Sequence, residues 1–407
     1  MNFSISNSKF ILYLAYTLFL ALMSFDLRTY LVTGRAISLL TSALIFIYLC
    51  GYFVLIKKYR FVRLRNLDVF IIAFFFLYIS RVYYDLYIQE IHHTIFQNKI
   101  TYFVYILFLS ILPYSVCRII PFSKFRMDKL LCLLSFFYLI ALLFSFSEVL
   151  HSIAMKTYYG NDGRFSANEM LDTIGYGHIA ATLTLMSISL LYYNSSSRSV
   201  RFYSVLGLIV GVFSIIIANS RSPMLALLFC LFLIYIKKIN LKVLVAFSFC
   251  LFLFVFNIES IDQFFQETFK SAFVERFVSI FSGDMNALSG RDTYYNQGIQ
   301  MFFDSPIIGS SFLLQSGDMR GDYVHNFFIE SLMFGGLIGG IIYIVIMIIS
   351  FRYAYHLIKE RNEYMFFGLF FMQMFIYSMF SRSFIALPLY WVSISSLYTI
   401  SICKEKR

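Results

Sequence analysis

Charged residues are scarce in this chain of 407 residues, at 14% of the sequence, whereas a soluble domain carries about 25%. Apolar residues make up 60% and aromatic residues 20%, with 50 Phe and 31 Tyr. A soluble protein of this size has no single core large enough to bury so much apolar surface. The mean hydropathy of +0.76 agrees. The composition excludes nuclear, cytosolic and secreted proteins and predicts a chain that crosses a membrane many times.

Proline and glycine are also few, with 5 Pro and 19 Gly, below their usual shares of about 5% and 7%. This favours long, unbroken helices. None of the six Cys residues lies in a long polar loop, and no Cys-x-x-Cys pair is present. A disulfide framework and a cysteine metal site are therefore both excluded.

A membrane-spanning helix needs about 20 mostly apolar residues. Runs of this kind predict an all-α transmembrane bundle of about 12 helices, with residues 1–407 forming one integral membrane domain. The first run lacks a small-residue cleavage site, so we expect it to be retained. The runs are 10–25, 37–56, 68–84, 100–117, 130–147, 174–193, 203–218, 222–236, 242–257, 326–350, 364–381 and 384–402.

Most of the 33 Lys and Arg residues fall in alternate loops, which places those loops and both termini in the cytoplasm. The net charge of +11 therefore reflects topology and not nucleic-acid binding. Two loops on the opposite, outer side are long: 148–173 and 258–326. In a chain with so few polar residues, we expect the function to lie in these loops.

The long outer loop begins with an amphipathic pattern over 258–283, typical of a helix that lies flat on the bilayer or packs on the bundle. A second helix is predicted to end at Asp304, with Arg291 in its first turn. An acid is usual at that place. A cation there makes sense if it shares an anionic ligand with the free backbone amides.

Two further residues are unusual for their position. His325 lies where the polar loop becomes an apolar helix, and the positive end of the helix dipole would keep its ring a neutral proton acceptor. Its alternative role is an interfacial cap. Arg221 lies between two apolar runs with no acid nearby in sequence. It either extends to the outer headgroups or binds a partner.

The order of these features resembles the superfamily of O-antigen polymerases (Wzy) and O-antigen ligases (WaaL), which are integral membrane glycosyltransferases of the GT-C type. The resemblance covers about 203–350 at the level of motifs. The residues that carry it are Ser220-Arg221, Arg291, Pro306-Ile-Ile-Gly309, His325-Asn326 and Gly335-Gly336.

The resemblance implies that Arg221, Arg291 and His325 handle a sugar attached to a lipid diphosphate. Arg164 adds a weaker similarity, because Arg164 and Gly175 have the Arg-x10-Gly spacing of polymerase outer loops. The same spacing fails at Arg291, where Phe302 stands in place of glycine.

The chemistry of glycosyl transfer agrees with these roles. Transfer from undecaprenyl diphosphate releases a diphosphate whose growing negative charge needs a metal or fixed cations. The sequence has no Asp-x-Asp signature for Mg²⁺, so we expect no metal or other cofactor. Two arginines bind phosphate oxygens in bidentate fashion and stay charged, while His325 accepts the proton of the attacking hydroxyl.

Other residues near these positions are candidates for substrate contacts or for orienting the histidine. Asp292, Asp322 or Glu330 could orient His325 or act as the base in its place. Asn326 is a candidate substrate contact, and Tyr294 and Tyr295 are candidates for stacking on sugar rings.

The sequence thus predicts a surface-polysaccharide polymerase with its active site on the periplasmic face of a bacterial inner membrane. Its substrates would be undecaprenyl-diphosphate-linked oligosaccharides, and its pathway partners a chain-length regulator and a flippase. The first alternative is an O-antigen ligase that transfers finished chains to lipid A-core. The second is a polysaccharide flippase or transporter, although transporters usually place polar residues on broken helices at the midplane.

Overall fold

The computed structural model describes the chain in several stretches. They are 65–119, 122, 126–154, 173–193, 198–218, 220–236, 257, 260, 263–264, 267, 291–317 and 319–405. Three predicted spans (10–25, 37–56 and 242–257) fall almost entirely outside these residues, as does most of the amphipathic stretch 258–283.

Every regular element in the described part is a helix, which confirms the all-α prediction for this part. Helix α4 continues into a π-helical turn, η1, while α5, η2 and α6 follow one another without a break. The bounds are α4 Asn66–Tyr83, η1 Tyr84–Ile88, α5 Lys99–Ile106, η2 Leu107–Ile111, α6 Leu112–Ile119, α7 Met127–Ala154, α8 Thr173–Tyr193, α9 Arg198–Ala218, α10 Arg221–Tyr235, α14 Arg291–Asp304, α15 Phe327–Glu360, α16 Met365–Phe380 and α17 Pro388–Glu405.

Five helical segments in the described residues are long and apolar enough to cross a membrane, so the chain is a multi-pass membrane protein. They are Asn66–Ile88, Lys99–Arg118, Ile174–Tyr193, Arg198–Ala218 and Phe327–Glu360. The weakest predicted pair, 203–218 and 222–236, is present as α9 and α10. The count of about twelve spans and their direction remain predictions.

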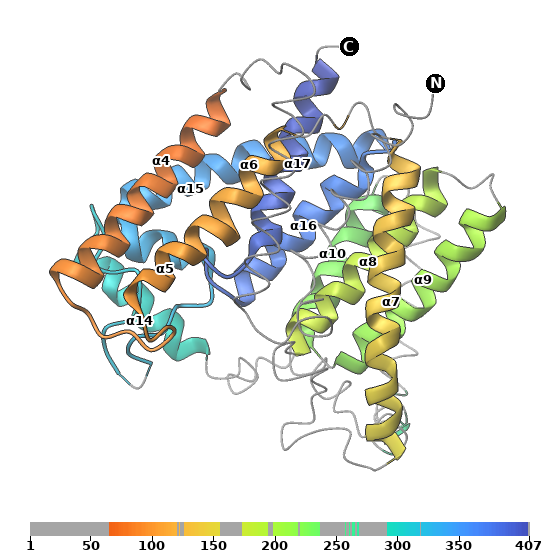
Figure 1. The fold of residues 1–407 in the computed structure, drawn as a ribbon, viewed down its shortest axis with the longest axis horizontal. Helices are drawn as coiled ribbons and strands as arrows, with labels where there is room; N and C mark the ends of the chain where they lie inside the picture. The colour runs from red at the N-terminus through yellow and green to blue at the C-terminus, as the bar shows by residue number, and fades with distance from the viewer. Residues whose placement is uncertain are drawn as a thin grey trace, which may run out of the picture.

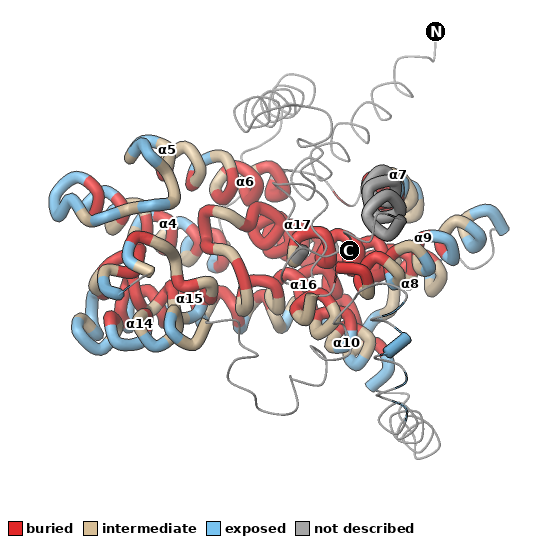
Figure 2. The backbone as a smooth tube through the Cα atoms, turned by 90° about the horizontal axis from the view of Figure 1, so that it is seen from below, coloured by how far each residue is buried: buried red, intermediate tan, exposed pale blue. Residues whose placement is uncertain are grey.

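The core of the bundle is built around α16 and α17, which are buried on nearly every side (Figure 2). A helix that is apolar all round, as α16 is, belongs inside a bundle. Helix α16 packs against α8, α10, α15 and α17. Helix α14 lies at the end of the molecule opposite the C-terminal end of α17 (Figure 1).

An ion pair between Arg81 of α4 and Asp85 of η1 holds the loop between α14 and α15, because each partner also bonds to the backbone of that loop. Arg81 Nε lies 2.8 Å from Asp85 Oδ1, and the Asp85 side chain is fully buried. Arg81 Nη1 donates to the carbonyl of Gly309 at 3.1 Å, and Asp85 Oδ2 accepts from the amide of Phe312 at 2.9 Å. Both charges of this buried pair are therefore satisfied by the same loop.

The same loop docks into a break in α15. Gly336 has φ 57° and ψ −149°, which interrupts the helix, and Gly309 also has a positive φ of 79°. A side chain on Gly309 would clash with the backbone of Phe334, and one on Gly336 would clash with the backbone of Ile307. The glycines of the Pro-x-x-Gly and Gly-Gly motifs thus allow two backbone segments to pack directly on each other.

Candidate functional site

Helix α14 spans Arg291–Asp304, and its end at Asp304 and the position of Arg291 in its first turn agree with the sequence prediction. It packs against the beginning of α15. Arg291 lies in the first turn, and Tyr294 and Tyr295 follow within one turn. All three residues are half-buried.

Tyr294 connects α14 to the residues just before α15. Its hydroxyl donates to Asp322 Oδ2 at 3.4 Å, and its ring lies edge-on to the His325 ring with centroids 5.1 Å apart. The centroid of the Tyr323 ring also lies 4.4 Å from that of the same imidazole. His325 therefore packs against two tyrosine rings.

The electrostatics of this group connect it to Arg291. Burial raises the pKa of Asp322, while bonds from the Tyr323 amide and the Tyr294 hydroxyl lower it. Burial and the nearby Asp322 charge raise the pKa of Tyr294, and the Arg291 charge opposes that rise. Arg291, Tyr294, Asp322 and His325 thus form one cluster of interacting groups.

His325 precedes the N-cap of α15 and has a positive φ of 58°. Asn326 is the N-cap itself, because its Oδ1 accepts from the amides of Phe328 and Ile329 at 3.0 and 3.1 Å. Its Nδ2 donates to the carbonyl of Met379 at 3.0 Å. Both ends of the Asn326 amide group are engaged by backbone, which favours a role in positioning His325 over direct contact with substrate.

Tyr295 reaches the same carbonyl from α14. Its hydroxyl donates to Met379 O at 3.3 Å. Burial raises the pKa of Tyr295, and the Arg291 charge together with side-chain hydrogen bonds from Asn326 and Arg291 opposes this rise. The cluster is therefore attached to the C-terminal end of α16.

Arg221 is the first residue of α10 and is half-buried. The next residue, Ser222, has its hydroxyl 2.9 Å from His178 Nε2 on α8. The His178 ring stacks on Tyr377 of α16, with centroids 3.8 Å apart and planes at 15°. Tyr377 and Met379 both lie in the last turn of α16, so the start of α10, through His178, and the Arg291–His325 cluster are linked to the same helix end.

The remaining predicted residues differ in their placement. Arg164 lies outside the described residues. Asp292 is half-buried in the first turn of α14. Glu330 is fully buried, and its carboxylate accepts from Ser383 Oγ at 2.6 Å, Tyr78 OH at 3.1 Å and the Phe384 amide at 3.3 Å. These bonds join Glu330 to α4 and to the turn after α16.

Two residues near this end of α16 are not among those that the sequence predicts for the site: His178 and Arg382. Arg382 follows α16, and its Nε donates to the Tyr377 hydroxyl at 3.3 Å. The hydropathy pattern does not distinguish His178, which is buried within a spanning segment. Arg382 could have been found from the sequence, because Ser381-Arg382-Ser383 repeats the Ser220-Arg221-Ser222 pattern between two apolar runs.

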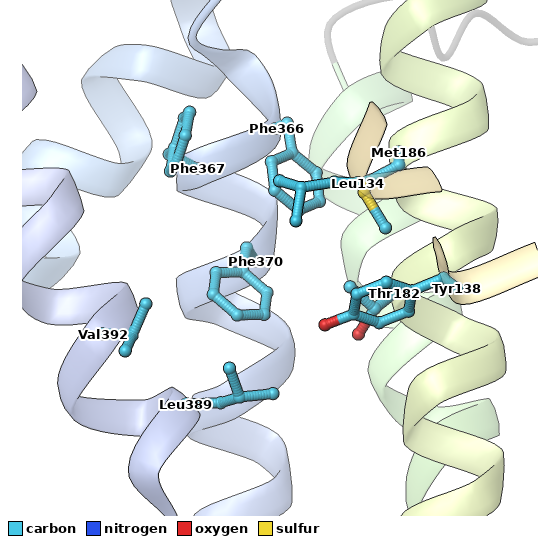
Figure 3. Close-up of a pocket in the computed structure, with 9 residues that line it drawn as sticks. All are labelled: Leu134, Tyr138, Thr182, Met186, Phe366, Phe367, Phe370, Leu389 and Val392. Atoms are coloured by element: carbon cyan, nitrogen blue, oxygen red, sulfur yellow. The ribbon is translucent and has the colours of Figure 1, made fainter. Parts of the chain in front are cut away.

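A small gap lies elsewhere, in the interior between α7, α8, α16 and α17 (Figure 3). Its volume is about 10 Å³, and its lining is mostly apolar, with Phe366, Phe370 and Leu389 among the side chains that surround it. A space of this size holds one water molecule at most. It is a packing defect and not a candidate substrate site.

Residues 206–344 match the family model Wzy_C, described as O-antigen ligase. No curated protein matches the chain. The matched segment lies within the 203–350 range that the motifs predict and contains Arg221, Arg291 and His325. The resemblance to this family is thereby confirmed. Arg382 lies beyond the matched segment.

Proposed function

From the Wzy_C O-antigen ligase family domain of this membrane protein, we propose that the chain is a polysaccharide polymerase. It transfers a growing glycan from undecaprenyl diphosphate onto a new lipid-linked repeat unit at the outer face of a bacterial inner membrane. The family domain supports the general function, which is that of a membrane glycosyltransferase acting on lipid-linked glycans. The choice of acceptor and the roles of individual residues are our proposal.

The arrangement of residues around the C-terminal end of α16 is the observation that most supports the proposal. Arg291 and His325 belong to one cluster that is bonded to Met379. Arg221 begins the helix that contacts Tyr377 through His178. These links to the last turn of α16 support a shared site for Arg221 and His325, which are 104 positions apart in the sequence.

The proposed reaction uses two kinds of group. His325 takes the proton from the attacking sugar hydroxyl as the new glycosidic bond forms at the anomeric carbon. The anomeric C–O bond to the diphosphate breaks, and its electron pair stays on the departing undecaprenyl diphosphate. Arg221 and Arg291 stabilise that charge with guanidinium groups that do not deprotonate.

The surrounding residues would hold this apparatus in place. Asn326 fixes the backbone next to His325, and the two flanking tyrosine rings fix the imidazole. Asp322 lies beside Tyr294, which shares an edge contact with His325. We propose that Asp322 acts through Tyr294 to orient the base, and that Tyr294 and Tyr295 offer their open edges to sugar rings.

A ligase is the second candidate, because O-antigen ligase is the printed description of the matched family. The donor and the charge chemistry would be the same, and the acceptor would be lipid A-core. Incubation of the purified protein with lipid-linked repeat units alone separates the two. Elongation without lipid A-core supports the polymerase, whereas product formation only when lipid A-core is added refutes it.

The residue roles have their own test in the same assay. Arg221→Ala, Arg291→Ala and His325→Ala should each lower elongation about 100-fold or more, the usual effect of removing one stabilising group at such a site. Arg291→Lys should also fail if bidentate contact is required. Thr293→Ala, at an exposed position in the same turn, is a matched control. Normal chain length in all three alanine variants would remove the site assignment.

A further inference from the structure

The turn between α16 and α17 contains a charged residue in an unfavourable backbone conformation. Arg382 has φ 71°, in the left-handed region that favours glycine. The described part of the chain has four non-glycine residues with positive φ, and Arg382 and His325 are the two beside this site. Strain of this kind persists only where the surrounding structure imposes it, and it concentrates at functional positions.

The surrounding structure does impose the conformation of this turn. The next residue, Ser383, donates to the buried Glu330 carboxylate at 2.6 Å, and the Phe384 amide donates to the same carboxylate at 3.3 Å. The Phe384 carbonyl accepts from Trp391 Nε1 at 3.0 Å and Ser110 Oγ at 2.8 Å. Anchors from several helices therefore fix the turn immediately after Arg382.

The guanidinium of Arg382 is also directed. Its Nε donates to the Tyr377 hydroxyl at 3.3 Å, and the Tyr377 ring stacks on His178, next to the start of α10. Three residues before Arg382, the Met379 carbonyl accepts bonds from Tyr295 and Asn326. Arg382 thus lies on the segment that joins the Arg221 region to the Arg291–His325 cluster.

We propose that Arg382 is a third substrate-contacting arginine of this site and binds the diphosphate of the lipid-linked substrate. This rests on the proposed function. Arg382 and Arg221 share the Ser-Arg-Ser sequence, and each lies at the junction of two apolar helices. The diphosphate gains a negative charge when the anomeric bond breaks, so a further fixed cation stabilises the departing group more than the bound donor.

The test compares purified Arg382→Gln and Arg382→Lys with Tyr377→Phe. The phenylalanine control removes the partner of Arg382 Nε and keeps the guanidinium. Binding of radiolabelled undecaprenyl diphosphate is measured, with undecaprenyl monophosphate and inorganic pyrophosphate as competitors. We expect Arg382→Gln to weaken diphosphate binding about 10-fold or more and to reduce the preference for diphosphate over monophosphate. Tyr377→Phe loses only the hydrogen bond that directs the guanidinium, so it should lose clearly less affinity than Arg382→Gln.

Competition by pyrophosphate alone would show that the headgroup suffices, while competition only by the lipid would show that the chain contributes as well. Wild-type affinity in Arg382→Gln overturns the proposal, and so does an equal loss in Tyr377→Phe, which would make the role structural. If Arg382→Gln does not fold, Arg382→Lys decides: unchanged affinity in the folded lysine variant refutes a bidentate contact. Wild-type protein that binds undecaprenyl diphosphate but does not elongate repeat units refutes the polymerase and leaves the Arg382 contact standing.

Discussion

Gly336→Ala should uncouple the loop after α14 from α15, and the size of the effect follows from the structure. Gly336 has φ 57° and ψ −149°, a combination that is almost restricted to glycine, and a residue held there costs about 1–3 kcal/mol. The added methyl group would also clash with the backbone of Ile307. Inserting a methyl group into packed structure costs about 1–3 kcal/mol. The two effects sum to about 2–6 kcal/mol.

Gly335→Ala is the matched control at the neighbouring position. Its methyl group would meet a flexible Leu77 side-chain atom at 3.1 Å, which can move. Alanine is also a better helix former than glycine by about 1 kcal/mol. We therefore expect Gly335→Ala to leave the stability nearly unchanged.

Thermal unfolding in detergent, followed by size-exclusion chromatography, measures both variants beside the wild type. Gly336→Ala should lower the melting temperature by many degrees and reduce glycan elongation, because the displaced loop leads directly to His325. Equal melting temperatures for the two variants would refute the claim that backbone packing between Gly309 and Gly336 holds the loop.

Three further predictions address the mechanism, the electrostatics and the topology. Elongation should survive EDTA, because fixed guanidinium groups supply the charge; activity lost in EDTA and restored by Mg²⁺ would refute this mechanism. Burial raises the pKa of Asp322 in the folded protein. The stability of the fold should therefore decrease as the pH rises from the pKa of Asp322 in the unfolded chain to its higher pKa in the folded protein. Thermal melts at a series of pH values should show this decrease in the wild type and not in Asp322→Asn. Ser316→Cys, at an exposed loop position, should react with a membrane-impermeant thiol reagent that is added to intact cells. Lys359→Cys, also at an exposed position, should react only after the cells are lysed. The reverse pattern would invert the topology.

The helices were predictable because membrane segments obey a simple rule of length and hydropathy. Even the closely spaced pair α9 and α10 is present: α9 ends at the predicted residue 218 and begins five residues earlier than predicted, and α10 lies within one residue of its predicted bounds. The break in α15 was not predictable in the same way. The sequence contains Gly335-Gly336, but only the fold shows that Gly336 interrupts α15 to receive the Ile307 backbone.

Part of the candidate site could be proposed from the sequence, where unusual residues fall in polar segments. Arg291, Asp322 and His325 are conspicuous in a loop beside apolar helices, and in the structure Tyr294 interacts with each of the three. His178 was missed because a histidine inside an apolar helix gives no local sign of what it faces. Its contact with Ser222 joins positions 44 residues apart, and only the packing of α8 on α10 creates it.

Glu330 illustrates how the fold changes the interpretation of a residue. From its position one turn into α15, the sequence suggests a partner for His325. In the structure its carboxylate bonds Ser383 and Phe384, so its influence reaches the site through the turn that carries Arg382. A buried carboxylate that loses its donors is costly, and this cost keeps the turn in its strained form.

Two buried polar side chains thus organise the site: Asn326 fixes the backbone beside His325, and Glu330 fixes the backbone beside Arg382. His325 and Arg382, two non-glycine residues with positive φ, are each followed by a residue that is fixed by hydrogen bonds, which is the arrangement expected when rigid placement of two polar side chains matters more than local backbone energy.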